Sequence, residues 1–429
     1  MVAYFVAEQE RLGGDELASL QRRRIAAMME RVLASNPFYA KKFSGMAFDA
    51  ETSNVQSLPF TTRQEIQQDQ QDHPPYGTNL TYPIDRYVRQ HQTSGTSGRP
   101  LRWLDSADDW AWFRHCWGII YRAADVGPQD RFIFPFSFGP FIGFWAAFES
   151  AVAMGNLCLP AGGMTTSARL RYLMENEVTV VACTPTYALR MAEVATDDGI
   201  DLAGSSVRML IVAGEPGGNV PSTRARIESA WGARVFDHAG MTEIGPWGFE
   251  CVEAPGGMHV IESEFIAELI DPDGDQPVPD GEIGELVLTN LGRLGSPLIR
   301  YRTGDQVRLT RGPCACGRSF ARVEGGILGR SDDMVIIRGN NVFPSAIEGI
   351  LHGFDEVAEF RVEVDQGASV TELRIEVEPG SSQGADRLGQ RIDRALRDRL
   401  HFRPVVRMVA PGTLPRFEMK AQRWTVRGR

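Results

Sequence analysis

Residues 178–213 read VTVVACTPTYALRMAEVATDDGIDLAGSSVRMLIVA, and this stretch decides the fold class. Segments 178–183 and 207–213 are short apolar runs, which are typical of strands that a sheet buries on both faces. Residues 186–196 are predicted as a helix between them. A strand, a helix and a second strand in this order indicate a parallel pair joined by a crossover helix.

The same alternation extends in both directions from this stretch. Further strands are predicted at 131–134, 156–160 and 234–237, and further helices at 144–154, 166–175 and 221–231. This rhythm predicts an α/β domain with mostly parallel sheets and flanking helices. Upstream, we expect helices at 16–35 and 105–124 and a strand at 87–92.

Two changes of pattern follow downstream. From about Glu264, short strands at 265–270, 284–289, 299–302 and 307–310 are separated by Gly, Pro and Asp, which predicts a small antiparallel β subdomain. From about Ser331, strands are predicted at 335–338, 357–365, 371–378 and 405–409, and helices at 344–351 and 385–400. We therefore expect a large N-terminal domain over 1–330 and a small α+β C-terminal domain over 331–429.

Length and composition agree with this division. The chain has 429 residues, whereas single cores stop growing at roughly 250–300 residues. Neither an apolar stretch of about 20 residues nor a secretory signal pattern is present, so we expect no membrane span and a cytoplasmic location. The net charge of −10 argues against a non-specific nucleic-acid binder.

A glycine-rich loop follows the strand predicted at 87–92. Before Pro100 it consists of Thr93, Ser94, Gly95, Thr96, Ser97, Gly98 and Arg99. Glycine lets the backbone approach a phosphate closely, and successive N–H groups and hydroxyls can surround phosphate oxygens. The loop lacks the GxxxxGK[ST] pattern of the P-loop. By itself it fits a flexible Ser/Gly turn equally well.

Five further motifs could complete a nucleotide site. They are GMTE at 240–243, YRTGD at 301–305, GRSDD at 329–333, RGNNVFP at 338–344 and PRFEMK at 415–420. The carboxylate of Glu243 beside the Thr242 hydroxyl suits a Mg²⁺ ion that also binds phosphate. Asp305 could bind a ribose diol, and Lys420 supplies a cation. Each motif also has an ordinary interpretation as a turn, a helix cap or a solvated side chain.

In this order the motifs resemble the adenylate-forming superfamily of acyl-CoA synthetases, and most of all the phenylacetate–CoA ligases. GRSDDMVIIRGNNVFP at 329–344 is the most specific match, and CTPTY at 183–187 and GEP at 214–216 also resemble that branch. The resemblance covers nearly the whole chain from about Tyr87 onward. It implies two half-reactions: a carboxylate attacks the α-phosphate of ATP to give an acyl-adenylate and pyrophosphate, and the thiol of coenzyme A then displaces AMP.

The resemblance also implies a role for each matching residue. The loop would hold the β- and γ-phosphates, Thr242 and Glu243 would bind phosphate and Mg²⁺, and Lys420 would approach the carboxylate and the α-phosphate. Asp332 would be the hinge about which a mobile lid domain rotates between the half-reactions. The other implied ATP contacts are Glu215 and Pro216 at the adenine, Asp305 and Arg330 at the ribose, and His238, Ala239, Gly240 and Met241 beside the phosphate motif.

Three positions differ from the family's usual pattern. An aromatic residue that stacks on adenine usually precedes the glycine of GMTE, but here this residue is Ala239, preceded by His238. A small residue usually precedes the lysine near the C-terminus, where this chain has Met419. Arg99 replaces a common lysine and keeps its charge. Ala239 leaves open what covers the adenine, and Met419 leaves open how closely the lid fits.

A metal site is the next candidate. Cys314 and Cys316 form a tight pair, and Cys251 lies eight residues before His259. Three thiolates and one imidazole suit a closed structural Zn²⁺ site, although the usual CxxC spacing is absent. Some phenylacetate–CoA ligase-like enzymes carry cysteines and a histidine in these places, so the resemblance implies zinc. Two unrelated pairs of reduced residues in turns are the alternative.

An apolar pocket for the acid is expected between segment 136–141 and the strand ends near residues 214 and 240. Its predicted lining is Phe138, Phe141, Gly214, Ile244 and Trp247. A flat apolar cavity favours an aryl or arylacetic acid over a long acyl chain. The same aromatic side chains would also suit an ordinary core.

Three functions stay open from the sequence. The first is an aryl-acid–CoA ligase that uses ATP, Mg²⁺ and coenzyme A. The second is an adenylating enzyme of the same fold with another acceptor: an amine, a carrier-protein thiol, or a nitrogen oxyanion such as nitrite, as in diazo-forming relatives. The third is a nucleotide-binding protein that no longer catalyses. A homodimer is expected from the resemblance alone.

Overall fold

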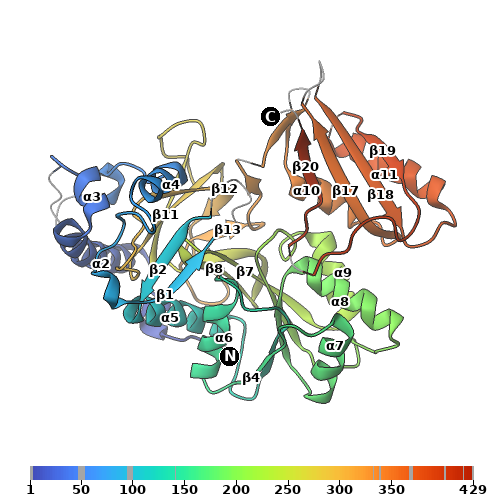
Figure 1. The fold of residues 1–429 in the computed structure, drawn as a ribbon, viewed down its shortest axis with the longest axis horizontal. Coiled ribbons are helices and arrows are strands. Elements are labelled where there is room, and N and C mark those ends of the chain that lie inside the picture. Colours follow the sequence, from blue (N-terminus) through green and yellow to red (C-terminus); the bar gives the residue numbers. More distant parts are fainter. Residues whose placement is uncertain are drawn as a thin grey trace. The chain divides into compact units, whose positions relative to one another are not determined.

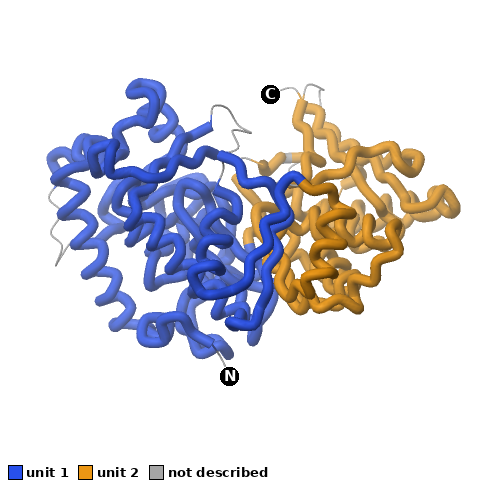
Figure 2. The backbone as a smooth tube through the Cα atoms, turned by 60° about the horizontal axis from the view of Figure 1, so that its bottom comes forward, with its two compact units in different colours: residues 1–163, 236–326 blue, residues 164–235, 327–429 orange. Residues whose placement is uncertain are grey.

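The computed structural model describes residues 3–46, 54–93, 100–140, 142–331, 333–337, 340–366, 371–400, 402–418 and 420–427. These residues group into two compact units (Figure 2). Unit 1 contains Met1–Gly163 and Phe236–Gly326, and unit 2 contains Met164–Val235 and Ile327–Arg429. The units do not follow the expected boundary at 330, because residues 164–235 group with the C-terminal segment. A division into domains 1–330 and 331–429 therefore stays a prediction.

Unit 1 begins with helices. Their bounds are α1 Ala7–Glu10, α2 Gly14–Ser35, α3 Pro37–Lys42, η1 Val55–Ser57, α4 Arg63–Asp72 and η2 Ile84–Arg86 (Figure 1). Helix α2 buries Ile25, Met28, Met29 and Val32, which recur at helical spacing on one face. This face belongs to a core cluster that also includes Ile299. The predicted helix at 16–35 is confirmed.

The largest set of strands in unit 1 is antiparallel. The order is β10-β11-β12-β13-β9-β8-β7, and each neighbouring pair is antiparallel. The bounds are β7 Arg234–Met241, β8 Gly245–Cys251, β9 Ala254–Val260, β10 Phe265–Ile270, β11 Ile283–Asn290, β12 Tyr301–Thr310 and β13 Arg322–Glu324. Strands β8 and β9 were not predicted, because their glycines and prolines indicate turns when read without cross-strand partners.

Strand β12 corrects the sequence analysis, which expected two strands at 299–302 and 307–310. One strand, β12, covers residues 301–310, so it contains the second expected strand and only the end of the first. It has an irregularity where the pairing changes from Glu285↔Gln306 to Val287↔Arg302. Gly304 within it has a φ of 75°, which a residue without a Cβ adopts at little cost. Strand β7 is also longer than predicted, so His238 and the GMTE glycine belong to the strand itself.

A hairpin and a parallel pair complete unit 1. Strand β1 (Tyr87–Gln92) pairs antiparallel with β2 (Arg102–Ser106). Helix α5 (Ala107–Ala123) begins after Ser106, which forms a capping box with Asp109. The expected helix at 105–124 therefore starts two residues late. Strands β3 (Arg131–Phe134) and β4 (Leu157–Pro160) are parallel, and α6 (Trp145–Ala153) lies between them in sequence.

The first segment of unit 2 contains the strand–helix–strand stretch. Strands β5 (Val180–Cys183) and β6 (Met209–Val212) are parallel and fully buried, and α8 (Pro185–Asp197) connects them. Helices α7 (Thr166–Glu175) and α9 (Pro221–Trp231) have the predicted bounds. The prediction from residues 178–213 is confirmed.

The C-terminal segment of unit 2 has its own sheet and core. The bounds are β14 Gly329–Arg330, β15 Val335–Ile337, β16 Asn340–Val342, α10 Pro344–Leu351, β17 Val357–Asp365, β18 Glu372–Pro379, α11 Ala385–Leu400, β19 Val405–Met408 and β20 Trp424–Arg427. The sheet order is β19-β18-β17-β20. Its apolar face and the buried side of α11 share one core cluster. Strand β20 was not predicted, although its residues Trp424, Thr425, Val426 and Arg427 alternate between apolar and polar.

No helix among the described residues combines the length and the apolar character that crossing a membrane requires.

Candidate active site

The glycine-rich loop joins β1 to β2. At its base, Thr93 N donates to Leu101 O at 2.9 Å, and Leu101 N donates to Thr93 Oγ1 at 3.0 Å. The members Ser94, Gly95, Thr96, Ser97, Gly98 and Arg99 lie outside the described residues. The structure therefore describes the closed base of the loop, and the phosphate-binding role of its tip stays a prediction.

Thr242 and Glu243 follow directly after β7. Glu243 is buried, and its Oε1 lies 3.5 Å from Arg63 NH1 of α4. The hydroxyl of Tyr301, at the start of β12, donates to the same oxygen at 3.4 Å. Both of these contacts are long and both involve Oε1. Because a carboxylate can accept about four hydrogen bonds, Glu243 keeps acceptor positions with which it could bind a hard cation.

His238 and Ala239 occupy the strand positions expected near the adenine. His238 is buried, and its Nδ1 lies 2.7 Å from Gly248 O. The Trp117 ring lies 4.4 Å from its ring, centroid to centroid. Burial lowers the pKa of His238 to about 4, so the ring is neutral near pH 7 and Nδ1–H is the donor to Gly248 O. Trp117 therefore packs on His238, a contact that the sequence did not indicate.

Asp305 lies on the irregular part of β12. Its side chain is buried, and its backbone N–H donates to Thr303 Oγ1 at 3.0 Å. Bulges next to functional sites re-aim a side chain relative to the regular strand alternation. The ribose contact that the resemblance implies for Asp305 stays a prediction.

Lys420 belongs to unit 2 and lies beside Gly214, which follows β6. A methyl group on Gly214 would lie 3.2 Å from the Cε of Lys420, so the absent side chain makes room for the lysine. The next residue, Ala421, donates its N–H to Glu215 Oε2 at 2.8 Å. Thr186 N, at the start of α8, donates to Glu215 Oε1 at 2.9 Å. One carboxylate thus joins the GEP motif, the CTPTY motif and the lysine segment.

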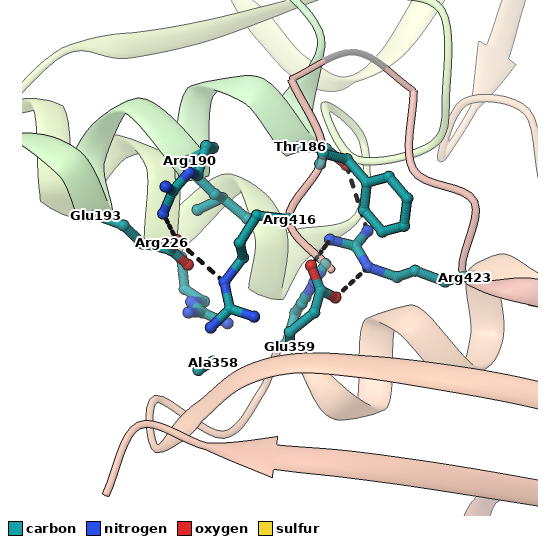
Figure 3. A pocket seen from close by; sticks show the side chains of 11 residues that line it. Thr186, Arg190, Glu193, Arg226, Ala358, Glu359, Arg416 and Arg423 are labelled. Atoms are coloured by element: carbon teal, nitrogen blue, oxygen red, sulfur yellow. Dashed lines mark hydrogen bonds and ion pairs between the residues drawn. The ribbon is translucent and has the colours of Figure 1, made fainter. Parts of the chain in front are cut away.

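Arginines support the same segment from both sides. Arg423 pairs with Glu359 of β17, with Nε–Oε1 at 2.5 Å, and donates to Thr186 Oγ1 at 3.3 Å. Arg416 pairs with Glu378 at 2.6 Å. Arg226, Arg416 and Arg423 line a cavity of about 20 Å³, which has room for about one water molecule. Figure 3 shows these side chains. Arg423 was not predicted from the sequence. The one feature that could have indicated it is its position three residues after Lys420.

The residues expected to line the acid pocket are in different environments. Phe138 is half-buried in an aromatic cluster, with ring centroids 4.4 Å from Trp145 and 5.0 Å from Phe136. Ile244 and Trp247 are fully buried in unit 1. Gly214 lies in unit 2, and Phe141 lies outside the described residues. A shared pocket for these residues stays a prediction.

Of the remaining predicted contacts, Arg330, Asp332 and Pro216 belong to unit 2, whereas Gly240 and Met241 belong to unit 1. Arg330 is half-buried on the two-residue strand β14. Asp332, the predicted hinge, lies outside the described residues. Pro216 follows Glu215 in a loop that Gly217 continues with a φ of 154°. Gly240 and Met241 close β7 and pair with Pro246 and Gly245 of β8.

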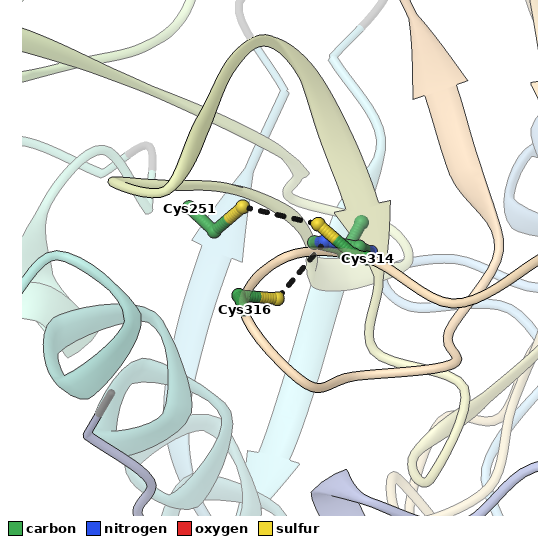
Figure 4. Close-up of side chains that lie close together, drawn as sticks. Cys251, Cys314 and Cys316 are labelled. Atoms are coloured by element: carbon green, nitrogen blue, oxygen red, sulfur yellow. Dashed lines mark hydrogen bonds between the residues drawn. The ribbon is translucent and has the colours of Figure 1, made fainter. Parts of the chain in front are cut away.

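The four candidate zinc ligands come together in unit 1. Figure 4 shows the three cysteines among them. Their ligand atoms all lie within 4.8 Å of one another. Cys251 Sγ is 3.7 Å from Cys314 Sγ, and Cys316 Sγ is 3.5 Å from His259 Nε2. Thiolates around tetrahedral zinc lie about 3.7 Å apart, because each Zn–S bond is about 2.3 Å. His259 Nδ1 lies 3.1 Å from Phe320 O, so a hydrogen bond there leaves Nε2 to face the sulfurs.

The chain was compared with known protein families and structures. The model of the AMP-binding enzyme family matches residues 55–292, and that of the AMP-binding enzyme C-terminal domain matches residues 339–426. A phenylacetate-coenzyme A ligase of Thermus thermophilus is 31% identical, with 96% of each chain covered. One of Escherichia coli is 31% identical, with 84% of this chain and 82% of the relative covered.

A solved structure agrees with these relatives. The 2-hydroxyisobutyryl-CoA ligase in its postadenylation state, in complex with 2-HIB-AMP, is 27% identical and has a TM-score of 0.88. The match covers 94% of this chain and 88% of that one. The predicted fold class, an α/β adenylate-forming domain followed by a small C-terminal domain, is thereby confirmed. The chain belongs to the AMP-binding enzyme family, in its branch of AMP-forming acid–CoA ligases.

Proposed function

We propose that this protein activates an aromatic carboxylic acid with ATP and transfers the acyl group to coenzyme A. The observation that carries the proposal is the position of Lys420, which lies against Gly214 while Glu215 holds the neighbouring amide of Ala421. Glu215 of the GEP motif is hydrogen-bonded both to the CTPTY motif and to the residue after Lys420. A lysine held in this way supplies a positive charge at a fixed place, whereas the charge of a solvated lysine would move.

The proposed chemistry has two steps. In the first, a carboxylate oxygen of the acid bonds to the α-phosphorus of ATP, and the bond to the bridging oxygen breaks to release pyrophosphate. Lys420 would offset the negative charge where these two anions meet. In the second step, the thiolate of coenzyme A attacks the acyl carbonyl, and AMP leaves. Thr242 and Glu243 would hold Mg²⁺, which when bound neutralises phosphate charge.

The lysine itself is unusual within this chain. Of 45 basic residues, only Lys41, Lys42 and Lys420 are lysines, so arginine supplies nearly every other positive charge. Lysine carries a compact ammonium group on a flexible stem, whereas arginine presents a planar fork. A chain that uses arginine elsewhere but lysine at this position supports a specific need for a compact cation.

An aromatic acid is supported by the side chains after β3. Phe136, Phe138 and Phe148 are half-buried, and their rings contact one another at centroid distances of 5.0 and 5.4 Å. Partly exposed aromatic clusters can form one wall of a pocket for a flat apolar ligand. The relatives named above are phenylacetate-coenzyme A ligases, which agrees with an aromatic acid.

Pyrophosphate release over a set of aryl and arylacetic acids, measured with and without coenzyme A, tests the proposal. We expect one or more acids to support release and coenzyme A to convert the product to a thioester. Lys420→Ala should lose adenylation but keep thiol transfer from a supplied acyl-adenylate, and Lys41→Ala is the matched control. Adenylation that survives in Lys420→Ala contradicts the lysine role. AMP formation that ignores coenzyme A points instead to an amine, carrier-protein or nitrogen acceptor.

We also propose a structural Zn²⁺ bound by Cys251, His259, Cys314 and Cys316. The sulfur and nitrogen separations fit a tetrahedral ion, and the contact of His259 Nδ1 with Phe320 O orients the ring. Although burial works to lower it, hydrogen bonds to Cys314 and Cys316 raise the pKa of His259 to about 9 in the metal-free cluster. Metal analysis of protein purified without an affinity tag tests this site. One zinc per chain is expected, and protein that is folded and active without metal contradicts it.

The assembly state and the cellular location stay predictions. A homodimer follows only from the resemblance, and equilibrium sedimentation of the purified protein tests it. Fractionation of the source cells tests the expected cytoplasmic location.

A further inference from the structure

Arg293 is an arginine whose side chain is entirely buried in unit 1. It lies between β11 and β12, and its exposed fraction is 0%. Its NH1 donates to Thr242 O at 2.9 Å and to Glu243 O at 2.7 Å. One guanidinium therefore holds the main chain of both residues that are proposed to bind phosphate and Mg²⁺.

The charge of Arg293 is paired with a second buried group. Its Nε and NH2 each lie 2.7 Å from Asp105 Oδ1, and Asp105 is also 0% exposed. Asp105 belongs to β2, the strand that follows the glycine-rich loop. His91 of β1 faces the same carboxylate, with Nδ1 3.7 Å from Oδ2. The ion pair thus connects the β1–β2 hairpin to the Thr242–Glu243 segment.

Neighbouring hydrogen bonds make the same connection. Asn290 Nδ2 donates to Ile244 O at 3.3 Å, which ties the end of β11 to the residue after Glu243. On the other side, Gly295 N donates to Asp109 Oδ1 at 3.0 Å, and Ser296 Oγ donates to Leu104 O at 2.9 Å. Residues 290–296 therefore contact both segments.

Close packing leaves this segment little room to move. The guanidinium carbon of Arg293 lies 5.4 Å from the Trp103 ring centroid and 5.1 Å from that of Phe113. A methyl group on Gly292 would lie 2.1 Å from Trp112 Cδ1. A charged group enclosed by aromatic rings cannot exchange its partners for water, so its hydrogen bonds persist.

We propose that Arg293, paired with Asp105, is a positioning residue that sets the place of Thr242 and Glu243 relative to the β1–β2 hairpin. This inference rests on the proposed function, because it assigns a purpose to the groups at Thr242 and Glu243. Arg293 and Asp105 are both fully buried, so we expect them to act through Thr242 and Glu243 and not by contact with the substrate. Their effect is to keep the cation-binding carboxylate at a constant distance from the strands β1 and β2 that flank the phosphate loop, and such preorganisation matters most for the ATP-dependent step.

The test compares Arg293→Met with a control at another buried ion pair of unit 1. Arg300 and Glu268 lie 2.8 Å apart, and Arg300 donates to main-chain oxygens of Gln56 and Leu58, away from Thr242. Arg300→Met combined with Glu268→Gln therefore removes a comparable pair without touching the proposed ATP site. Pyrophosphate exchange is measured as a function of ATP, Mg²⁺ and acid, and thiol transfer is measured from a supplied acyl-adenylate.

Arg293→Met should lower kcat/KM for ATP by ten- to a hundredfold and raise the Mg²⁺ concentration that half-saturates the exchange. The KM for the acid and the rate of thiol transfer should stay within about threefold of the wild type. The control variant should lose thermal stability without a selective change in ATP or Mg²⁺ dependence. An Arg293→Met enzyme whose losses are uniform over all substrates, or match those of the control, overturns the proposal.

Two further variants test the proposal if Arg293→Met folds poorly. Asp105→Asn keeps the shape of the pair and should show the same selective loss in milder form. Arg293→Lys keeps the charge but cannot reach the carboxylate and both carbonyls, so melting temperature should recover more than ATP dependence does. Recovery of both to the same extent contradicts a positioning role. If the wild type shows no exchange with any acid, the proposed function fails, and this result is distinguishable from unchanged ATP dependence in active variants.

Discussion

Glu215 connects segments that lie far apart in the sequence. Its two carboxylate oxygens accept the N–H groups of Thr186 and Ala421, 29 and 206 residues away. The resemblance places Glu215 at the adenine, and that role stays a prediction. The observed hydrogen bonds indicate a second role, which is to hold the main chain next to Lys420.

Glu215→Gln should slow adenylation selectively. The amide keeps one acceptor oxygen but replaces the other with a donor, so one backbone N–H loses its partner at a cost of about 1–3 kcal/mol. We expect a roughly tenfold lower adenylation rate and unchanged thiol transfer from a supplied acyl-adenylate. Glu228→Gln is the control, because Glu228 lies in the same unit and accepts from Val235 N. Equal losses in both half-reactions would argue that Glu215 serves general stability only.

Because of His238, we expect the stability of the folded protein to depend on pH in the acidic range. Burial lowers its pKa to about 4 in the folded protein, below the ordinary value of about 6.5. Above pH 6.5 the His238 ring is neutral in both the folded and the unfolded protein, so its contribution to the free energy of unfolding is fully present. As the pH falls from 6.5 to 4, the unfolded chain takes up the proton first, so stability is lost by up to about 3 kcal/mol.

The measurement is the melting temperature of the wild type and of His238→Gln between pH 7.5 and pH 4.5, since glutamine can also donate to Gly248 O but does not titrate. The wild type should lose more stability than the variant over this range. Parallel curves would show that His238 does not titrate as its environment indicates.

At the scale of elements, an irregular strand and a strand end carry the residues that are predicted to bind the nucleotide. The irregular part of β12 bears Asp305, and the end of β7 presents Thr242 and Glu243. The hairpin β8–β9 contributes Cys251 and His259 to the metal site, whereas Cys314 and Cys316 come from the turn after β12. Zinc would therefore cross-link the β8–β9 hairpin to the turn after β12.

Removal of the metal should loosen these elements locally. Treatment with a chelator, or Cys316→Ser, should increase hydrogen exchange in β8, β9 and residues 312–318 and lower the melting temperature by about 5 °C or more, since metal binding contributes directly to folding. Cys158→Ser is the control, because Cys158 lies on β4 outside the cluster. Unchanged exchange after chelation would show that the four residues pack as reduced side chains.

At the scale of the whole molecule, the C-terminal segment packs on residues 164–235 within unit 2. Ser222 Oγ donates to Gly349 O at 2.8 Å, Thr223 Oγ1 lies 2.7 Å from His352 Nδ1, and Arg226 NH2 donates to Val357 O at 3.2 Å. These hydrogen bonds are polar contacts, which suits an arrangement that forms for one step and separates for the next.

A reversible cross-link tests that motion. A disulfide between Ser222→Cys and Gly349→Cys should preserve one round of acyl-adenylate formation, because Lys420 stays beside Gly214. It should block thioester formation by tenfold or more until a reductant is added. The two single-cysteine variants are the controls. A cross-linked enzyme that completes both half-reactions at the wild-type rate would contradict a lid that moves away from residues 164–235.

The local sequence determined much of the molecule. The apolar runs at 178–183 and 207–213 form β5 and β6, and α7, α9, α10 and α11 have the predicted bounds, because these elements follow from periodicity and capping within a short window. The four metal-ligating candidates were also correctly grouped, since cysteine and histidine are few and chemically distinctive.

Tertiary structure decided the rest. Strands β8 and β9 have glycines and prolines that indicate turns locally, and only cross-strand hydrogen bonds make them strands. Arg293, Asp105 and Arg423 show no motif, because their importance comes from partners 50 to 188 residues away. The sequence by itself determined the family, the order of the elements and the chemistry of the candidate groups. Only the fold decided which buried charges hold those groups, because the partners of a buried charge are set by packing and not by neighbours in the chain.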